Sequence, residues 1–411
     1  MLNSKGEREL AYLVKIDNVT PIDGYDRVEL AHVGGWTVVV GKDEFKAGDT
    51  AIYFEIDSQL PEKPPFSDME FLVKKHYKIQ TQKMCKSISQ GLLMAVDQFP
   101  GWEVQVDGTV LDNNSGDHGL HTFYGDSRFL TKDLEVTYAV AEDNKRKSNP
   151  IDKYKKMAQR HPKLFKKKFV KWLMKRNWGK KLLFFFFGKK KDKKTGWPDW
   201  VAKTDEERVE NMLYIFNSDE LWIATEKIDG SSTTFSLKRN KSFFGPKYDF
   251  YICSRNVVFD KPNKKCFYDT NIYIEMAEKY NIEKKLTTIL ENHTEWEWIT
   301  IQGETYGAKV QKRDYNMTDR DFKVFNLVTP DIGRWSSNKM KQFLGFYDIP
   351  CVPILQSSYK LPTSIEELRK FVNSNPSQID GDMREGVVFR SQDGKKSFKC
   401  VSPEFLLKYH G

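Results

Sequence analysis

The tetrapeptide Lys227-Ile228-Asp229-Gly230 is the first candidate for chemistry, because it places an amine and a carboxylate directly after the apolar run 221–225. A lysine becomes a covalent nucleophile once its amine is neutral. Alone the tetrapeptide is weak evidence, since Lys-x-Asp-Gly occurs by chance in on the order of one in ten chains of this length. Five further motifs follow it in chain order: Ser254-Arg255-Asn256, Gln302-Gly303-Glu304, Phe322-Lys323-Val324-Phe325-Asn326, Glu385-Gly386-Val387-Val388 and Phe398-Lys399.

Each motif taken singly has an ordinary structural explanation. A Lys–Asp pair is most often a surface ion pair, and a Phe in a strand is most often part of a core. These roles do not account for six motifs in this order and spacing. The succession resembles motifs I, Ia, III, IIIa, IV and V of the covalent nucleotidyltransferase superfamily, which comprises DNA ligases, RNA ligases and mRNA-capping enzymes.

This resemblance implies that the amine of Lys227 attacks the α-phosphate of ATP and forms a lysyl-AMP phosphoramide. The amine must be neutral, and burial, a neighbouring cation or a metal lowers the pKa of a lysine. Lys399 and a bound Mg²⁺ or Mn²⁺ are the candidate cations. In the superfamily, carboxylates at these positions hold a hydrated divalent metal. The implied metal ligands are Asp229, Glu304 and Glu385, and the implied catalytic residues are these three with Lys227 and Lys399.

The resemblance also implies a nucleotide-binding set. Lys399 would neutralise charge on the α-phosphate, and Asp229 and Glu304 match residues that contact the ribose. Either Phe322 or Phe325 would stack on adenine. The remaining candidates are Arg255, which matches an arginine that contacts the nucleotide or the end being joined, and Glu226, which borders the base pocket in relatives.

The position of the β-rich region helps to decide which branch of the superfamily the chain resembles. DNA ligases and capping enzymes usually carry an OB domain after motif V, whereas here only 401–411 follow Lys399. The segments 36–61, 89–91, 203–211 and 405–408 resemble the fifth RNA-ligase family, which has an N-terminal OB module. Within 203–211, Arg208 is a candidate phosphate or substrate contact. One departure is motif V, where related RNA ligases have Lys-x-Lys and this chain has Lys399-Cys400-Val401, so Val401 stands where the second lysine would contact phosphate.

The elements that must position these residues follow from residue pattern. Short runs rich in β-branched and aromatic residues, separated by turn signals, predict strands at 11–16, 28–31, 36–40, 50–56 and 92–96. Such spacing favours a small OB barrel. Further on, strands are predicted at 221–225, 232–237, 250–253, 300–302, 322–327 and 386–389, and helices at 272–290, 336–345 and 364–373.

The predicted fold class is therefore α+β, with an N-terminal β-barrel followed by an antiparallel-sheet-rich α/β nucleotidyltransferase domain of ATP-grasp-like type. The predicted divisions are 1–105 for the OB domain, 106–196 for a linker or insert, and 197–411 for the nucleotidyltransferase domain. The stretch 153–194 is crowded with basic residues and holds one acid, Asp192. It is either a nucleic-acid arm or a solvated basic linker, partly helical.

Composition sets the remaining expectations. The 411 residues carry a net charge of +9 and 14% aromatics, which suits a polyanionic partner. The five cysteines are scattered, so neither disulfides nor structural zinc are expected. No stretch is apolar for the roughly 20 residues that a membrane span needs, and the first residues lack a signal-peptide pattern. We expect a monomer inside the cell, in the cytoplasm or nucleus.

The predicted function is ATP-dependent joining of a 5′-phosphate to a 3′-hydroxyl, with nicks in duplexes carrying an RNA 3′-OH strand as the substrate. A capping-type guanylyltransferase would use GTP, and a DNA ligase would be indifferent to a ribose at the 3′ end. A non-catalytic nucleic-acid-binding protein is the alternative from a different class. Retention of the five catalytic candidates argues against it.

Overall fold

The computed structural model describes residues 1–99, 128–139, 197–203, 205–242, 245–255, 257–259 and 271–410, with the isolated positions 170, 173, 176 and 183. By internal contacts the chain divides into two compact units. One comprises Met1–Ala139 with Pro198–Gly411, and the other comprises Val140–Trp197. The predicted divisions after 105 and 196, and most of the predicted basic segment, lie outside the described residues.

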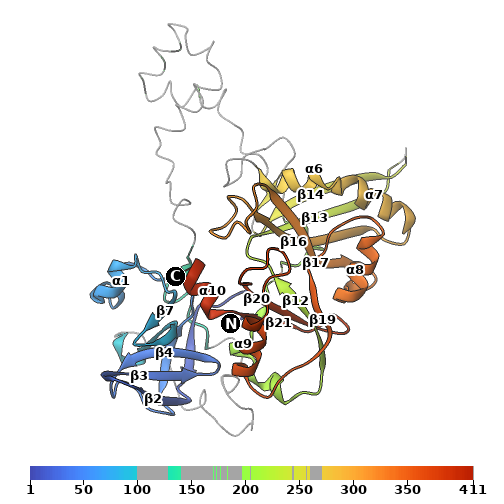
Figure 1. The fold of residues 1–411 in the computed structure, drawn as a ribbon. Coiled ribbons are helices and arrows are strands. Elements are labelled where there is room, and N and C mark those ends of the chain that lie inside the picture. The colour runs from blue at the N-terminus through green and yellow to red at the C-terminus, as the bar shows by residue number, and fades with distance from the viewer. Residues whose placement is uncertain are drawn as a thin grey trace. The chain divides into compact units, whose positions relative to one another are not determined.

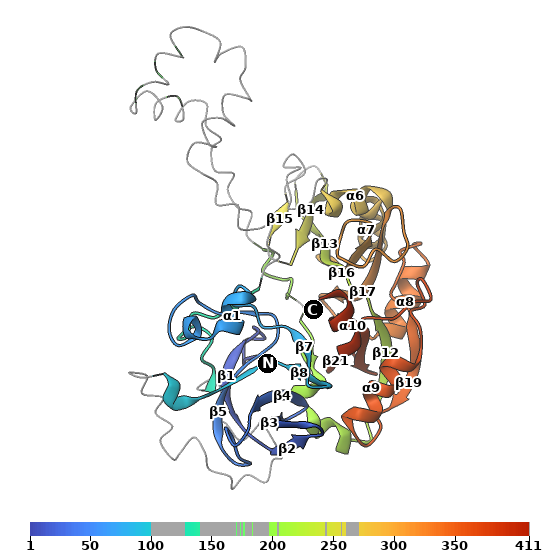
Figure 2. The same cartoon turned by 60° about the vertical axis from the view of Figure 1, so that its left-hand side comes forward.

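The N-terminal region is a barrel of short antiparallel strands (Figures 1 and 2). Strand β5 pairs with both β1 and β9, β3 lies between β2 and β4, and β7 forms a hairpin with β8. The strands are β1 (Ala11–Lys15), β2 (Asn18–Ile22), β3 (Tyr25–Val33), β4 (Trp36–Gly41), β5 (Thr50–Phe54), β6 (Ser58–Gln59), β7 (Thr81–Met84), β8 (Ser87–Gln90) and β9 (Leu92–Ala95), joined by β10 (Thr137–Tyr138).

Period-2 alternation explains why β4 forms a strand with one buried face. Trp36, Val38 and Val40 are buried, whereas Thr37 and Val39 between them are partly exposed. The predicted strands at 11–16, 28–31, 36–40, 50–56 and 92–96 are confirmed to within a few residues. The prediction omitted β2, β7 and β8, whose sequences are more polar. A short helix, α1 (Glu70–Lys74), precedes β7.

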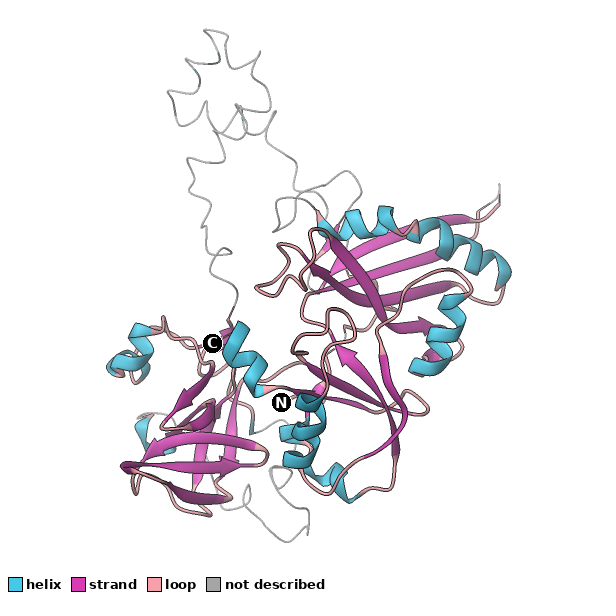
Figure 3. Ribbon diagram, in the orientation of Figure 1, coloured by secondary structure: helices cyan, strands magenta, loops and turns pink. Residues whose placement is uncertain are grey.

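The C-terminal region is built on two sheets (Figure 3). The five-stranded sheet has the order β11-β21-β20-β12-β19, and the six-stranded sheet has the order β15-β14-β13-β16-β17-β18. Their strands are β11 (Glu207–Arg208), β12 (Leu221–Lys227), β13 (Ser231–Asn240), β14 (Lys247–Ser254), β15 (Val258–Phe259), β16 (Trp298–Gly307), β17 (Arg320–Thr329), β18 (Gly333–Arg334), β19 (Ile354–Lys360), β20 (Gly386–Ser391) and β21 (Ser397–Val401).

The predicted single helix at 272–290 is wrong. The chain forms two helices, α6 (Ile272–Lys279) and α7 (Ile282–Asn292), because Asn281 adopts a left-handed conformation with φ 50°. Asparagine tolerates this conformation better than most residues, so Asn281 ends one helix and begins the next. The predictions at 336–345 and 364–373 are confirmed as α8 (Ser337–Gly345) and α9 (Ile365–Ser374). A further helix, α10 (Pro403–Tyr409), begins after the capping side chain of Ser402.

The barrel and the C-terminal region share hydrophobic contacts and hydrogen bonds. Val401 and Leu406 belong to the hydrophobic core of the barrel. Trp36 Nε1 donates to Asn211 Oδ1 at 2.8 Å, and Gly35 N donates to Glu210 O at 2.9 Å. A Cβ atom at Gly35 would lie 2.6 Å from the Cα of Glu210, so only glycine allows this approach.

Candidate active site

Lys227 and Glu385 meet because their strands are adjacent. Strand β12 pairs antiparallel with β20, with Lys227 opposite Gly386, so Glu385 lies directly before the paired strand. Lys227 Nζ is 2.5 Å from Glu385 Oε1. The glycine of the Lys-x-Asp-Gly motif has a steric role, since a Cβ at Gly230 would lie 2.3 Å from the carbonyl oxygen of Thr305. Gly230 therefore lets the motif approach β16, which carries Glu304.

Charge in this group of residues is strongly coupled. Burial raises the pKa of Glu304 to about 8; Lys227 opposes the rise, while Glu385 and Asp229 add to it. Burial acts to lower the pKa of Lys227, but the surrounding carboxylates outweigh burial and the pKa is raised. The sequence-based expectation was a lowered pKa. The difference arises because three carboxylates surround the amine, and their charge must be neutralised before the amine can lose its proton.

Asp229 is held from two sides by residues that sequence reasoning did not select. Its backbone N–H donates to the hydroxyl of Tyr315 at 2.6 Å, and its Oδ2 lies 3.3 Å from Nε2 of His410, just after α10. Tyr315 in turn stacks on the guanidinium of Arg313, which binds both carboxylate oxygens of Asp380 at 2.7 and 2.9 Å. Asp229 is thus fixed through its backbone and its side chain.

Lys399 belongs to a second, cation-rich group. Strand β21 places it beside Arg208 of β11, and its Nζ lies 2.7 Å from Asp205 Oδ1. Asp205 also accepts a hydrogen bond from Arg255 Nη2 at 2.6 Å and lies 3.9 Å from Arg8. Burial lowers the pKa of Lys399 to about 8, with Asp205 opposing and Arg8, Arg208 and Lys227 assisting. The two predicted cations Lys399 and Arg255 are therefore brought together by one unpredicted carboxylate.

The barrel contributes to this second group through Glu55. Its carboxylate is fully buried and forms ion pairs with Arg8 and with the amino group of Met1. Arg208 lies 3.7 Å from Glu55 and 3.6 Å from Asp57, and its guanidinium stacks over the Trp36 ring at 5.5 Å. Burial would raise the pKa of Glu55, but these cations lower it to about 2. Arg208 is thus anchored in the barrel rather than free at the surface.

The two candidate aromatics on β17 lie on different faces of the sheet. Phe322 is fully buried and contacts Phe235 edge-on at 5.2 Å, in the core that includes α6 and α7. Phe325 is partly buried and packs in a separate cluster with Ile228 and Tyr306. Glu226, the third base-pocket candidate, is buried and accepts hydrogen bonds from Ser377 Oγ and from the backbone N–H of Gln378.

The donor set fits a divalent metal with few protein ligands. Oε2 of Glu385 is buried and has no hydrogen-bond partner, which leaves one carboxylate oxygen available. Within the described parts of the chain, no three His, Cys, Asp or Glu side chains are arranged closely enough to form a complete metal site. The three predicted ligands Asp229, Glu304 and Glu385 therefore do not form such a group by themselves. Magnesium commonly takes one or two carboxylates and completes its shell with water and substrate phosphates, so Glu385 with one neighbour is the set that could hold it.

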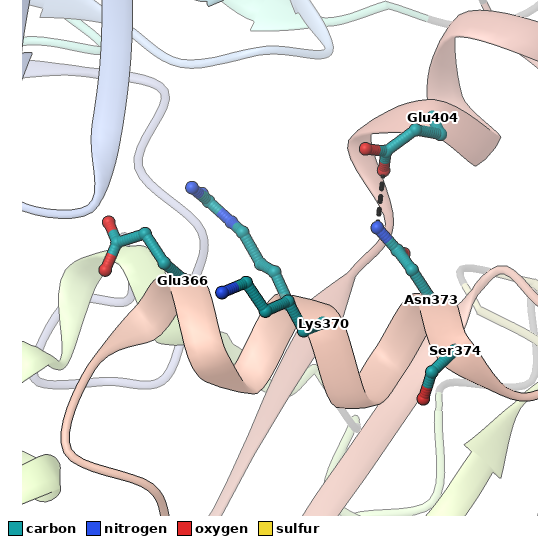
Figure 4. A pocket seen from close by; sticks show the side chains of 6 residues that line it. Glu366, Lys370, Asn373, Ser374 and Glu404 are labelled. Atoms are coloured by element: carbon teal, nitrogen blue, oxygen red, sulfur yellow. Dashed lines mark hydrogen bonds between the residues drawn. The ribbon is translucent and has the colours of Figure 1, made fainter.

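A surface hollow of about 490 Å³ lies on α9 and α10 (Figure 4). Asn373 Nδ2 donates to Glu404 Oε2 at 2.8 Å across it. Arg369 at its edge donates to Gly35 O and to Glu210 at 3.0 Å each. None of its lining residues belongs to the predicted site. Its hydrogen bonds connect α9 with Gly35, Glu210 and Glu404, which is a structural role.

Among the residues that sequence reasoning missed are Asp205, Tyr315 and His410, which contact predicted ones, and Arg8, which pairs with Asp205. Asp205 lies in the segment 203–211 that the motif comparison singled out, so a signal for it existed. The other three had no such signal, because their contacts depend on how distant segments pack.

No helix among the described residues is long and apolar enough to span a membrane.

Comparisons with known proteins agree with this arrangement. An OB-fold domain model matches residues 10–96, and the RNA ligase family model matches residues 220–410. No curated protein sequence matches the chain.

Solved structures of an RNA ligase from Naegleria gruberi share the fold. A glutamate-to-alanine variant with ATP and manganese is 23% identical, with a TM-score of 0.68, over 98% of this chain and 100% of that one. The same ligase with pyrophosphate is 23% identical, with a TM-score of 0.66, over 97% and 98% of the two chains. A lysine-to-methionine variant with AMP and manganese is 24% identical, with a TM-score of 0.68, over 98% and 99%. The chain thus combines a region that matches an OB-fold domain with an RNA ligase domain over residues 220–410.

Proposed function

We propose that the protein is an ATP-dependent RNA ligase that joins a 5′-phosphate to a 3′-hydroxyl through AMP bound covalently to Lys227. The observation that carries this proposal is the position of Lys227 within the RNA ligase domain. Its amine lies 2.5 Å from Glu385 and is electrostatically coupled to Glu304 and Asp229. A partly buried amine with carboxylates around it and a second lysine nearby suits attack on a polyphosphate.

The reaction has three displacements at phosphorus. The neutral amine of Lys227 forms a P–N bond to the α-phosphorus of ATP, and the bond to the β-phosphate breaks with release of pyrophosphate. An oxygen of the RNA 5′-phosphate then attacks the AMP phosphorus, and the P–N bond breaks to return the lysine. The 3′-hydroxyl finally attacks the activated 5′-phosphate, forms the phosphodiester and releases AMP.

Removing the proton from Lys227 is the central electrostatic task of the first step. A divalent ion held by Glu385 with Asp229 or Glu304 would neutralise carboxylate charge and thereby favour the neutral amine. Glu385 itself lies within hydrogen-bonding distance of Nζ and can hold or accept the leaving proton. Tyr315 fixes the backbone of Asp229, so the carboxylate and the amine keep a constant relation.

The other predicted residues receive roles from where they lie. Lys399 and Arg255, joined through Asp205, form a cationic pair suited to the α-phosphate and the incoming end. Phe325 is the candidate for adenine stacking, because Phe322 lies in the core. Glu226, whose carboxylate accepts hydrogen bonds from Ser377 and Gln378, borders the adenine pocket. Arg208 is the candidate phosphate contact on the side of the barrel.

The preferred substrate in this proposal is a nick in a duplex with an RNA 3′-OH strand, sealed by a monomer inside the cell. The net charge of +9 supports a polyanionic partner. The free thiols of Cys85, Cys253, Cys351 and Cys400 suit a reducing compartment.

Labelling with [α-³²P]ATP or [α-³²P]GTP and Mg²⁺ or Mn²⁺ tests the covalent step on a denaturing gel. The wild type should take label from ATP, whereas Lys227→Ala should take none. Lys360→Ala is the matched control, because Lys360 is an exposed lysine paired with Asp219 on the surface, and it should label normally. Label from GTP alone would indicate a capping-type enzyme. No label, from folded protein free of bound AMP, would leave only the binding protein.

A further inference from the structure

One stretch of the barrel, α1 with the β7–β8 hairpin, is rich in lysine. Residues 70–90 hold five lysines and one acid, Glu70, which pairs with Lys74 at 2.8 Å. Three large apolar side chains on the same stretch are also exposed, namely Phe71, Val73 and Met84. The segment 17–29 of the same barrel has the opposite character, with four acids and one arginine. We call α1 with the β7–β8 hairpin the basic face; its lysines are Lys74, Lys75, Lys78, Lys83 and Lys86.

The tip of the β7–β8 hairpin keeps a lysine where backbone conformation favours glycine. Met84 pairs with Ser87, so the turn consists of Cys85 and Lys86, which adopt φ angles of 50° and 64°. Two successive residues with positive φ form the turn that Asn-Gly satisfies best. A non-glycine pair there is strained, and such strain commonly marks a functional position. Because position 86 is lysine and not glycine, the hairpin tip carries an exposed, charged side chain.

The base of the β7–β8 hairpin lies next to the active site. Strand β7 lies beside α10 (Figures 1 and 2). Gln80, directly before β7, donates from Nε2 to the carbonyl oxygen of His410 at 2.8 Å. His410 in turn lies 3.3 Å from Asp229. A nucleic acid whose reacting ends lie at Lys227 can therefore extend along this hairpin.

We propose that the basic face grips the RNA duplex beside the nick, with the lysines on backbone phosphates. This inference rests on the proposed function and deepens it by naming the element that holds the substrate. Lysines act as point charges toward phosphates, so binding is independent of sequence. The exposed Phe71 and Met84 pack on the riboses, which the wide, shallow minor groove of an RNA duplex presents.

The test compares two charge-matched double variants of the full-length protein. Lys83→Gln with Lys86→Gly removes two charges from the hairpin, and glycine suits the turn, so folding is preserved. Lys42→Gln with Lys46→Gln removes two exposed charges elsewhere on the barrel. Lys42 and Lys46 follow β4 in the chain. The Thr37 hydroxyl donates to Ile88 O and the Val39 N–H donates to Ser89 Oγ, so β4 runs along β8 away from the hairpin tip and toward these two lysines. A fluorescein-labelled nicked RNA duplex is the probe, titrated in EDTA at several salt concentrations.

The hairpin variant should bind the nicked duplex several-fold more weakly, with a log Kd against log salt slope shallower by about 2. Its sealing of a pre-adenylylated nick should fall in parallel, while labelling of Lys227 by ATP stays at the wild-type level. The control should keep the wild-type slope. An unchanged slope in the hairpin variant, or an equal loss in the control, would overturn the proposal. Labelling reports the covalent step separately, so failure of the ligase assignment is distinguishable.

Discussion

Replacing Asp205 by asparagine tests whether a single carboxylate keeps Lys399 charged. Asp205 is the carboxylate that raises the pKa of Lys399 against burial and three neighbouring cations, and the balance places this pKa at about 8. An opposite charge at close range shifts a pKa by about 1 to 3. At pH 7.5 the protonated fraction of Lys399 would therefore fall from about three-quarters to about one-quarter or less.

The assay is the rate of lysyl-AMP formation at limiting ATP, measured from pH 6 to 9 for wild type and Asp205→Asn. The ratio of the two rates cancels the titration of Lys227 and isolates that of Lys399. We expect the rate of the variant relative to wild type to be highest at pH 6, about threefold or more below wild type at pH 7.5, and lowest at pH 9. Asp205→Glu should restore most of the rate.

Asp219→Asn is the control, because Asp219 is exposed and forms an ion pair with Lys360 at the surface. Thermal denaturation must confirm that Asp205→Asn is folded, since Arg8 and Arg255 also lose a charged partner. A ratio that is reduced by the same factor at every pH would refute the electrostatic reasoning and assign Asp205 a purely structural role.

Three further predictions concern other parts of the site. Gly230→Ala should abolish or strongly reduce labelling by ATP, because the new Cβ would lie 2.3 Å from Thr305 O; Ser231→Ala, one residue on, is the control. Phe325→Ala should raise the KM for ATP with little loss of stability, whereas Phe322→Ala should destabilise the fold by about 3–5 kcal/mol in chemical denaturation; the reverse pattern would reassign the stacking residue. The pKa of Glu55 is lowered to about 2 from 4.5, so folding is stabilised above pH 4.5 and loses about 3 kcal/mol as pH falls toward 2. Urea titrations across this range should show that slope in wild type and a smaller one in Glu55→Gln.

The strands and the motif residues were predictable because their signals are local. Alternation of buried and exposed residues marks β4, and apolar runs define strands that Lys227 ends and Glu385 directly precedes. Glu304 was expected just after a strand at 300–302 but lies within the longer strand β16. Alternation also implies that Phe322 and Phe325, three residues apart, face opposite ways. Which face is the core depends on where α6 and α7 pack, and that is a tertiary property.

The unpredicted parts of the site depend on contacts between distant segments. Arg8 and Asp205 are separated by nearly half the chain, and neither residue type signals a partner by itself. His410 follows a helix whose start is marked by Ser402 and Pro403, yet its contact with Asp229 depends on how that helix docks. The break at Asn281 was a local signal that the helical periodicity on both sides concealed.

The contacts of Gly35, Trp36, Val401 and Leu406 have a consequence for how the protein can be dissected. Residues near the end of the chain complete the hydrophobic core of the barrel, and Arg8 and Glu55 of the barrel lie beside Asp205 and Arg208, which are distant in sequence. Cutting the chain between the barrel and the ligase region would expose apolar surface on both fragments. It would also leave buried charged side chains without their partners. The two regions should therefore melt in a single transition, and neither should be obtainable as a well-folded fragment.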